Sequence, residues 1–174
     1  MQVRVMFTAL DAAPEQLDKH EQNFVANIRQ HGWFGTHVAT DGEGPGFSYT
    51  TGFWLKFGSP ELIVFSLQRE IAHDAFWHVY YELEAGRRFP VGEPTENIFK
   101  NAAAVLLPVS PDRYRSHLGW SRWFYGNDDF ECLQLVFPDQ GGEFPWTPGS
   151  TADFRAAQPD LTAGNWLGLR ERYN

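Results

Sequence analysis

Cysteine is nearly absent from this sequence, because Cys132 is the only one among 174 residues. A single thiol cannot form an internal disulfide, which fits a reducing compartment. Long hydrophobic runs are also missing: stretches such as 62–65 are far shorter than the ~18 apolar residues that span a bilayer. Since the first ten residues have neither a basic leader nor a long apolar segment, we expect a cytoplasmic protein with no membrane insertion and no export signal.

Basic residues are fewer than acidic ones: 14 Lys and Arg oppose 22 Asp and Glu, which gives a formal charge of -8. The acidic excess is present in both halves of the chain, so neither half offers the positive charge that attracts polyphosphate. Nucleic acid is therefore not an expected ligand. Negative charge steers cationic proteins toward a surface, so the composition favours a basic protein partner.

Catalytic and cofactor motifs are lacking as well. The sequence has no glycine-rich phosphate loop, no dinucleotide fingerprint and no Gly-x-Ser-x-Gly elbow. Cys132 lies in an apolar segment close to Asp129 and Glu131, where the thiol pKa rises and its nucleophilic reactivity falls. We expect no cofactor, and the balance of the sequence is against an enzyme.

Metal-ligand spacing is also absent. His73 and His78 lie five residues apart on an expected helix, which turns their side chains about 140° away from each other. Ligands on one helix face usually lie four residues apart, as in His-Glu-x-x-His. The acidic run 127–129 lacks the regular oxygen spacing of a calcium loop and predicts a solvated turn. No metal site is expected.

Helical periodicity predicts three helices. The first covers 15–31 and is stopped by Gly32; the second covers 69–85 and is stopped by Gly86. A third helix is expected after Pro111 and should bury Tyr114, Leu118 and Ser121 on one side. In the second helix an apolar residue recurs at every fourth position and should face a sheet: Ile71, Ala75, Val79 and Leu83.

Alternating, β-branched and aromatic residues predict strands over 33–40, 47–55, 62–67, 102–109 and 130–137. The pair 47–55 and 62–67 should be antiparallel, because the six residues between them are too few for a crossover helix. Segment 87–95 carries two prolines and suits an irregular or edge strand. With an extended C-terminal arm beyond Pro138, the order of elements predicts an α+β fold: one domain, 1–174, with helices packed on an antiparallel or mixed sheet.

A set of short motifs resembles the bacterial family named domain of unknown function 4262, over about residues 20–160. The motifs are His31-Gly32-Trp33, Tyr49-Thr50-Thr51-Gly52, Pro60-Glu61-Leu62, Gln134-Leu135-Val136-Phe137-Pro138-Asp139 and Phe144-Pro145-Trp146. The resemblance implies no particular activity. A looser similarity, in the order of the Thr-x-Gly and Glu-Leu elements before a long helix, is to suppressor-of-fused-like domains. That likeness implies an immunity protein that binds a toxin, although pattern analogy alone does not carry function.

Two groups of residues are candidate binding sites. Tyr49, Thr50 and Glu61 could line a polar pocket at the strand ends. Alternatively Tyr49 and Thr50 are ordinary strand residues, and Glu61 accepts backbone hydrogen bonds from the 58–59 turn.

The second group is aromatic and basic, and such residues anchor protein interfaces when exposed but fill the core when buried. Its members are Trp120, Arg122, Trp123, Tyr125 and Trp146. The leading hypothesis is a non-catalytic protein-binding domain, and its specific form is an immunity protein that neutralises a basic toxin. The alternative is a small-molecule-binding protein or enzyme with a pocket around Tyr49, Thr50 and Glu61.

Overall fold

The computed structural model describes residues 7–164 and 166. Its centre is a six-stranded sheet in the order β1-β2-β3-β6-β5-β4. Only β3 and β6 are parallel among the strand pairs in this described part; the other neighbours are antiparallel. The sheet is therefore mixed and the fold α+β, as predicted. The strands are β1 (Phe34–Val38), β2 (Phe47–Thr51), β3 (Glu61–Phe65), β4 (Pro94–Thr95), β5 (Ala104–Pro108) and β6 (Cys132–Val136).

The predicted antiparallel pair is confirmed by the register of Phe47 with Phe65 and of Tyr49 with Ile63. The prediction that the first of these strands runs to residue 55 is wrong. At Gly52 the backbone turns to φ +122°, and the chain enters the short helix α2 (Phe53–Phe57) before β3. The apolar side chains of α2 do not extend the strand; they pack in the two core clusters beside the sheet.

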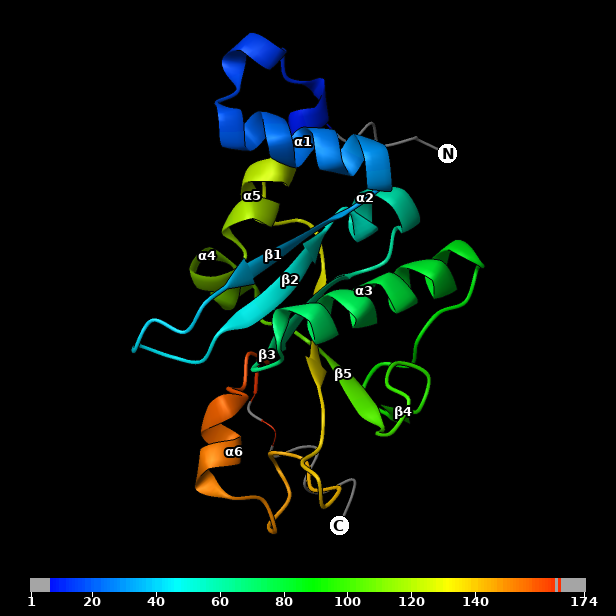
Figure 1. Cartoon of the computed structure of the whole chain (residues 1–174), viewed down its shortest axis with the longest axis vertical. Coiled ribbons are helices and arrows are strands. Elements are labelled where there is room, and N and C mark those ends of the chain that lie inside the picture. The colour runs from blue at the N-terminus through cyan, green and yellow to red at the C-terminus, as the bar shows by residue number, and fades with distance from the viewer. Residues whose placement is uncertain (1–6, 165, 167–174) are drawn as a thin grey trace.

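The helix α3 (Arg69–Glu84) covers one face of the sheet, and Figure 1 shows it crossing in front of β2 and β3. Ala75, Val79 and Leu83 are buried, as predicted. Ile71 is 46% exposed, so the prediction that it packs on the sheet is wrong. The buried stripe is centred on Ala72, Phe76 and Val79, which places Ile71 at its rim.

The opposite face is covered by α1 (Lys19–His31), α4 (Tyr114–His117) and α5 (Gly119–Tyr125). The helix α1 begins later than predicted because Asp18 caps it and forms a capping box with Glu21. The predicted third helix is divided at Leu118, whose ψ of 42° interrupts the helical backbone. Tyr114, Leu118 and Ser121 are nevertheless all buried, as predicted.

The C-terminal arm folds back along the lower end of the sheet in Figure 1 and carries a short helix, α6 (Ala152–Ala157), that was not predicted. Two buried glutamines fasten it. Gln134 of β6 donates to the Pro159 carbonyl (2.7 Å) and accepts from the Leu161 amide (3.1 Å). Gln158 of the arm pairs with both backbone polar groups of Phe137.

Candidate functional site

Glu61 begins β3 and is completely buried. Its Oε1 accepts hydrogen bonds from the Thr50 hydroxyl (2.9 Å) and the Phe53 amide (3.0 Å). Its Oε2 accepts from the amides of Gly52 (2.9 Å) and Trp54 (3.2 Å) and from the Tyr125 hydroxyl (2.5 Å). Five donors thus converge on one carboxylate, and three of them are the amides that open α2.

Burial and hydrogen bonding have opposite effects on the pKa of Glu61. Burial raises its pKa to about 6, and the hydrogen bonds from Tyr125, Gly52, Trp54 and Thr50 oppose that rise. Burial and the neighbouring carboxylate raise the pKa of Tyr125 as well. Because Glu61 has no exposed surface and each oxygen already has partners, it is placed to hold the fold together rather than to meet a ligand.

The same polar network ties α5 to β2. The Trp120 amide donates to the Tyr49 hydroxyl (3.0 Å), and the hydroxyls of Thr51 and Ser121 lie 2.7 Å apart. The Tyr125 hydroxyl also accepts from the Gly52 amide (3.2 Å). The structure therefore brings together four of the predicted site residues, namely Tyr49, Thr50, Glu61 and Tyr125, in the interior of the protein.

Gly52 explains why the His-Gly-Trp turn accompanies the Tyr-Thr-x-Gly strand. A Cβ atom at Gly52 would lie 2.5 Å from the Gly32 carbonyl oxygen and 2.8 Å from the Trp33 Cα. Such distances are too short for any side chain, so the two motifs meet backbone to backbone. Gln134, which belongs to another of the motifs, holds the C-terminal arm. Gly32, Gly52 and Gln134 therefore each have a structural role.

The aromatic residues of α5 are partly used inside the fold. Trp120 stacks on Phe24 of α1 (ring centroids 4.9 Å apart), and Trp123 meets the same ring edge-on (5.8 Å). Arg122 binds Asp128 (Nε to Oδ1, 2.6 Å). Trp146 is buried in a separate cluster with Val105, Leu107 and Val136. Trp120, Arg122 and Trp123 keep partly exposed surface, whereas Tyr125 and Trp146 do not.

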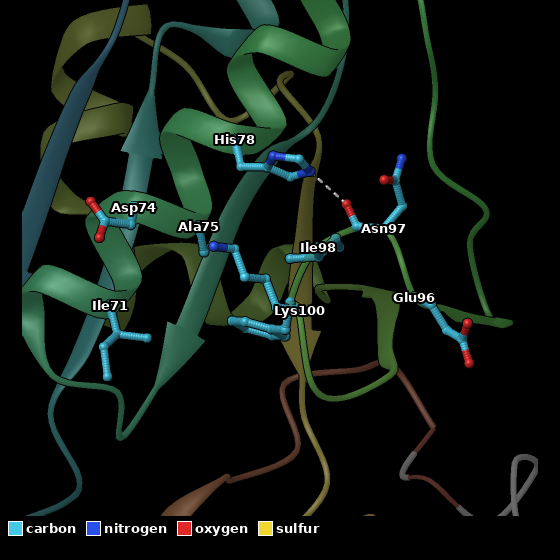
Figure 2. A pocket seen from close by; sticks show the side chains of 9 residues that line it. Ile71, Asp74, Ala75, His78, Glu96, Asn97, Ile98 and Lys100 are labelled. Atoms are coloured by element: carbon cyan, nitrogen blue, oxygen red, sulfur yellow. Dashed lines mark hydrogen bonds between the residues drawn. The ribbon is translucent and has the colours of Figure 1, made fainter.

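A groove of about 470 Å³ lies between α3 and residues 96–100 (Figure 2). The half-exposed Ile71 lines its α3 side with Asp74, and His78 crosses the groove to bind the Asn97 carbonyl (2.8 Å). Lys100 extends from the loop toward α3. The sequence does not indicate this groove, because its four-residue period predicts that Ile71 lies in the core. The mixture of apolar and charged residues on this side of α3 is the signal that could have indicated it.

A second opening of about 460 Å³, named here the acidic cleft, lies where β5 ends and β6 begins. Apolar side chains and prolines form most of its wall, and three carboxylates belong to its lining: Asp128, Asp129 and Glu131. Val91, which is 50% exposed, completes one side. The sequence predicts a solvated turn at 127–129, but it does not indicate that Val91 and Pro108 lie next to this turn.

A third cleft, of about 620 Å³, lies between the end of β1, the start of β2 and the residues that join β3 to α3. His37 and Ser48 face each other there, with Nδ1 and Oγ 2.6 Å apart. Burial lowers the pKa of His37, and the positive charges of Arg69 and His73 add to this. Ser48 is buried and is the register partner of His37, so the contact is a cross-strand pair rather than an exposed nucleophile beside its base.

No group of three or more His, Cys, Asp and Glu side chains suited to a metal ion occurs in residues 7–164 and 166. Within that range no helix has both the length and the hydropathy to cross a membrane. Burial, followed by the charge of Glu61, raises the pKa of the Cys132 thiol well above its usual value, which opposes its use as a nucleophile.

Comparison with curated proteins gives no match, and comparison with solved structures gives none either. A family model, described as domain of unknown function (DUF4262), matches residues 27–151. This range includes the buried carboxylate, both glycine motifs and the acidic cleft, and it is more than half of the 174 residues. The chain therefore belongs to the DUF4262 family.

Proposed function

We propose that the protein is a non-catalytic protein-binding domain whose partner is basic. The observation that supports this best is the composition of two surface openings. Ile71 and Val91 are each about half exposed, and each lines an opening that also contains carboxylates. Exposed apolar surface supplies contact area, while a net charge of -8 favours encounter with cations.

The arrangement gives less support to the alternative, a small-molecule or enzyme pocket around Tyr49, Thr50 and Glu61. All three side chains are buried, and the openings described above are lined by other residues. A catalytic carboxylate must reach a reacting atom within hydrogen-bond distance. Glu61 instead caps α2 with both oxygens.

The specific form of the proposal is an immunity protein that neutralises a basic toxin in the cytoplasm. The acidic charge and the loose likeness to suppressor-of-fused-like domains support it. Co-expression with the product of the adjacent gene tests this form. We expect host growth to be inhibited by that product alone and restored when this chain is present; inhibition that persists in the presence of a well-folded chain would contradict it.

Binding kinetics test the broader proposal. A partner isolated from the native host is purified, and its association with this chain is measured at low and at physiological ionic strength, where the Debye length is about 8 Å. We expect the association rate to fall as salt is added, because attraction between opposite charges accelerates encounter. An association rate that does not depend on salt, or an acidic partner, would contradict a basic-partner mechanism.

A further inference from the structure

We infer that the acidic cleft is where the partner docks, and that it receives a short segment of the partner that carries both basic and apolar side chains. This inference rests on the proposed function and makes it specific. Its basis is the combination, in one opening, of an apolar wall with carboxylates around it. Neither feature alone would identify the occupant.

The charge of the cleft is negative. Asp128 is bound by Arg122, which reduces its influence. Glu131 is exposed, and within residues 7–164 and 166 it forms no ion pair. Among the described residues that line this opening there is no Lys or Arg. A guanidinium or ammonium group of a partner can therefore pair with Glu131 without displacing a cation of the described residues.

The apolar wall selects against a simple cation. Val91, Pro108 and Pro111 form it together with the buried rings of Tyr114 and Phe130, which stack 4.9 Å apart. The Tyr114 hydroxyl is directed inward, to the Phe130 carbonyl (2.9 Å), so this side offers few polar groups. A volume of about 460 Å³ suits a few side chains. Apolar side chains between the basic ones would gain contact that a polyamine cannot.

The groove beside α3 fits such a segment less well. Its lining contains Lys100 and His78, and His78 already bridges to the opposite wall through the Asn97 carbonyl. A basic segment there would meet a resident ammonium group. The two openings thus provide a natural comparison, because both have carboxylates and one half-exposed aliphatic side chain, but they differ in local cations.

The test uses the full chain and a capped six-residue peptide that alternates arginine and leucine. Amide chemical shifts are followed by NMR during titration, and affinity is measured by calorimetry. We expect shifts centred on residues 108–114 and 128–133. Glu131→Lys should weaken binding about tenfold, whereas Glu96→Lys, the same charge change at the α3 groove, should weaken it less than about twofold. Val91→Ser should weaken binding, and Ile71→Ser should not.

Matched probes identify the occupant. Replacing leucine by serine in the peptide, or using spermidine, should abolish most of the affinity; equal binding of either would overturn the inference. Shifts centred on the α3 groove, or equal effects of Glu131→Lys and Glu96→Lys, would also overturn it. Sedimentation of the free chain must show a monomer, because a dimer closed through the cleft would make a second copy the occupant.

The two proposals can fail separately. If the native partner binds the Glu131→Lys variant as tightly as the unmodified chain, the cleft is not the docking site, while protein binding itself stands. If the association rate of the native partner does not depend on ionic strength, the proposal of a basic partner is wrong. Circular dichroism and thermal unfolding of each variant establish that a loss of binding reflects the surface, since Glu131, Val91, Ile71 and Glu96 are all exposed.

Discussion

At the scale of single residues, Glu61 carries the most structural information. The sequence predicts that the Glu61 carboxylate accepts hydrogen bonds from the amides of the 58–59 turn. In the structure it accepts them from the amides of Gly52, Phe53 and Trp54. The difference arises because α2 was not predicted, so its free amides were not available as partners. The need of a helix start for acceptors explains why an acid occupies this buried position.

We predict that Glu61→Gln lowers the free energy of unfolding by at least about 2 kcal/mol at pH 7. All five neighbours donate, so the amide nitrogen of glutamine must face a donor whichever way it is oriented. Urea denaturation measures the loss. Glu96→Gln, an exposed position, serves as the control and should change stability little. Equal stability of the Glu61 variant and the unmodified chain would refute the role of this carboxylate as a cap.

A second prediction concerns how the stabilities of the unmodified chain and of Glu61→Gln depend on pH. Because burial raises the folded-state pKa of Glu61 to about 6 from 4.5, the folded state binds this proton more readily than the unfolded state. Its contribution therefore stabilises the protein as pH falls from 8 to 4.5. The stability difference between the unmodified chain and Glu61→Gln should widen by roughly 1.5 kcal/mol over that range. A difference that narrows on acidification would show that the hydrogen bonds outweigh burial.

Gly52 is the residue at which the backbone leaves no room. We predict that Gly52→Ala is markedly more destabilising than Gly126→Ala, by roughly 1–3 kcal/mol. Both glycines have positive φ, +122° and +69°, so both substitutions incur backbone strain, but only at Gly52 does a Cβ collide with the Gly32 and Trp33 backbone. Thermal unfolding compares the two variants. Equal losses would mean that strain alone, and not the contact between motifs, requires glycine at residue 52.

At the scale of elements, the sequence predicted those that follow one clear period. The helix at 69–84, the antiparallel β2–β3 pair and the central β6 were predicted because their periodicity is strong and their ends are marked by Gly or Pro. The elements missed, α2 and α6, are five and six residues long. Helices this short are fixed by tertiary contacts such as Glu61, which local sequence does not contain.

The two sides of α3 provide a prediction at this scale. Leu83→Ala should cost about 2–5 kcal/mol, because Leu83 is buried against the sheet and its removal leaves a cavity. Ile71→Ala should cost much less, since nearly half of Ile71 is already exposed. Chemical denaturation of both variants tests which stripe of α3 faces inward. A larger effect at Ile71 than at Leu83 would contradict the packing of the Leu83 side of α3 against the sheet.

At the scale of the whole molecule, the candidate binding surface illustrates what sequence reasoning could not supply. The acidic cleft joins Val91, Pro108 and Glu131, which belong to separate segments and meet only because β5 and β6 are neighbours. Composition predicted an acidic protein, but it gave no position for the charge. The aromatic cluster at 120–125 was a local signal, and the structure uses much of it to pack α5 against α1 and β2.

The C-terminal arm is joined to the sheet by a small number of buried amides, and this gives the last prediction. Gln158 is almost fully buried, and its side chain pairs with both the amide and the carbonyl of Phe137, just beyond β6. Gln158→Met preserves volume but leaves the partly buried amide and carbonyl of Phe137 without their side-chain partner, so it should lower stability by about 1–3 kcal/mol. The hydrogen bond from the Leu161 amide to Gln134 holds the same arm. When the Gln158 contact is lost, we therefore expect the arm to open before the sheet unfolds.

Limited proteolysis distinguishes local opening from general destabilisation. In the Gln158→Met variant we expect cleavage between residues 138 and 164 at denaturant concentrations where β2, β3 and β6 remain protected in hydrogen exchange. Asp153→Asn, an exposed change on α6, is the matched control and should be cleaved as slowly as the unmodified chain. If the Gln158 variant loses stability but the arm and the sheet become susceptible together, the arm is an integral part of one cooperative unit, and the glutamine pairs do not act as its separate attachment.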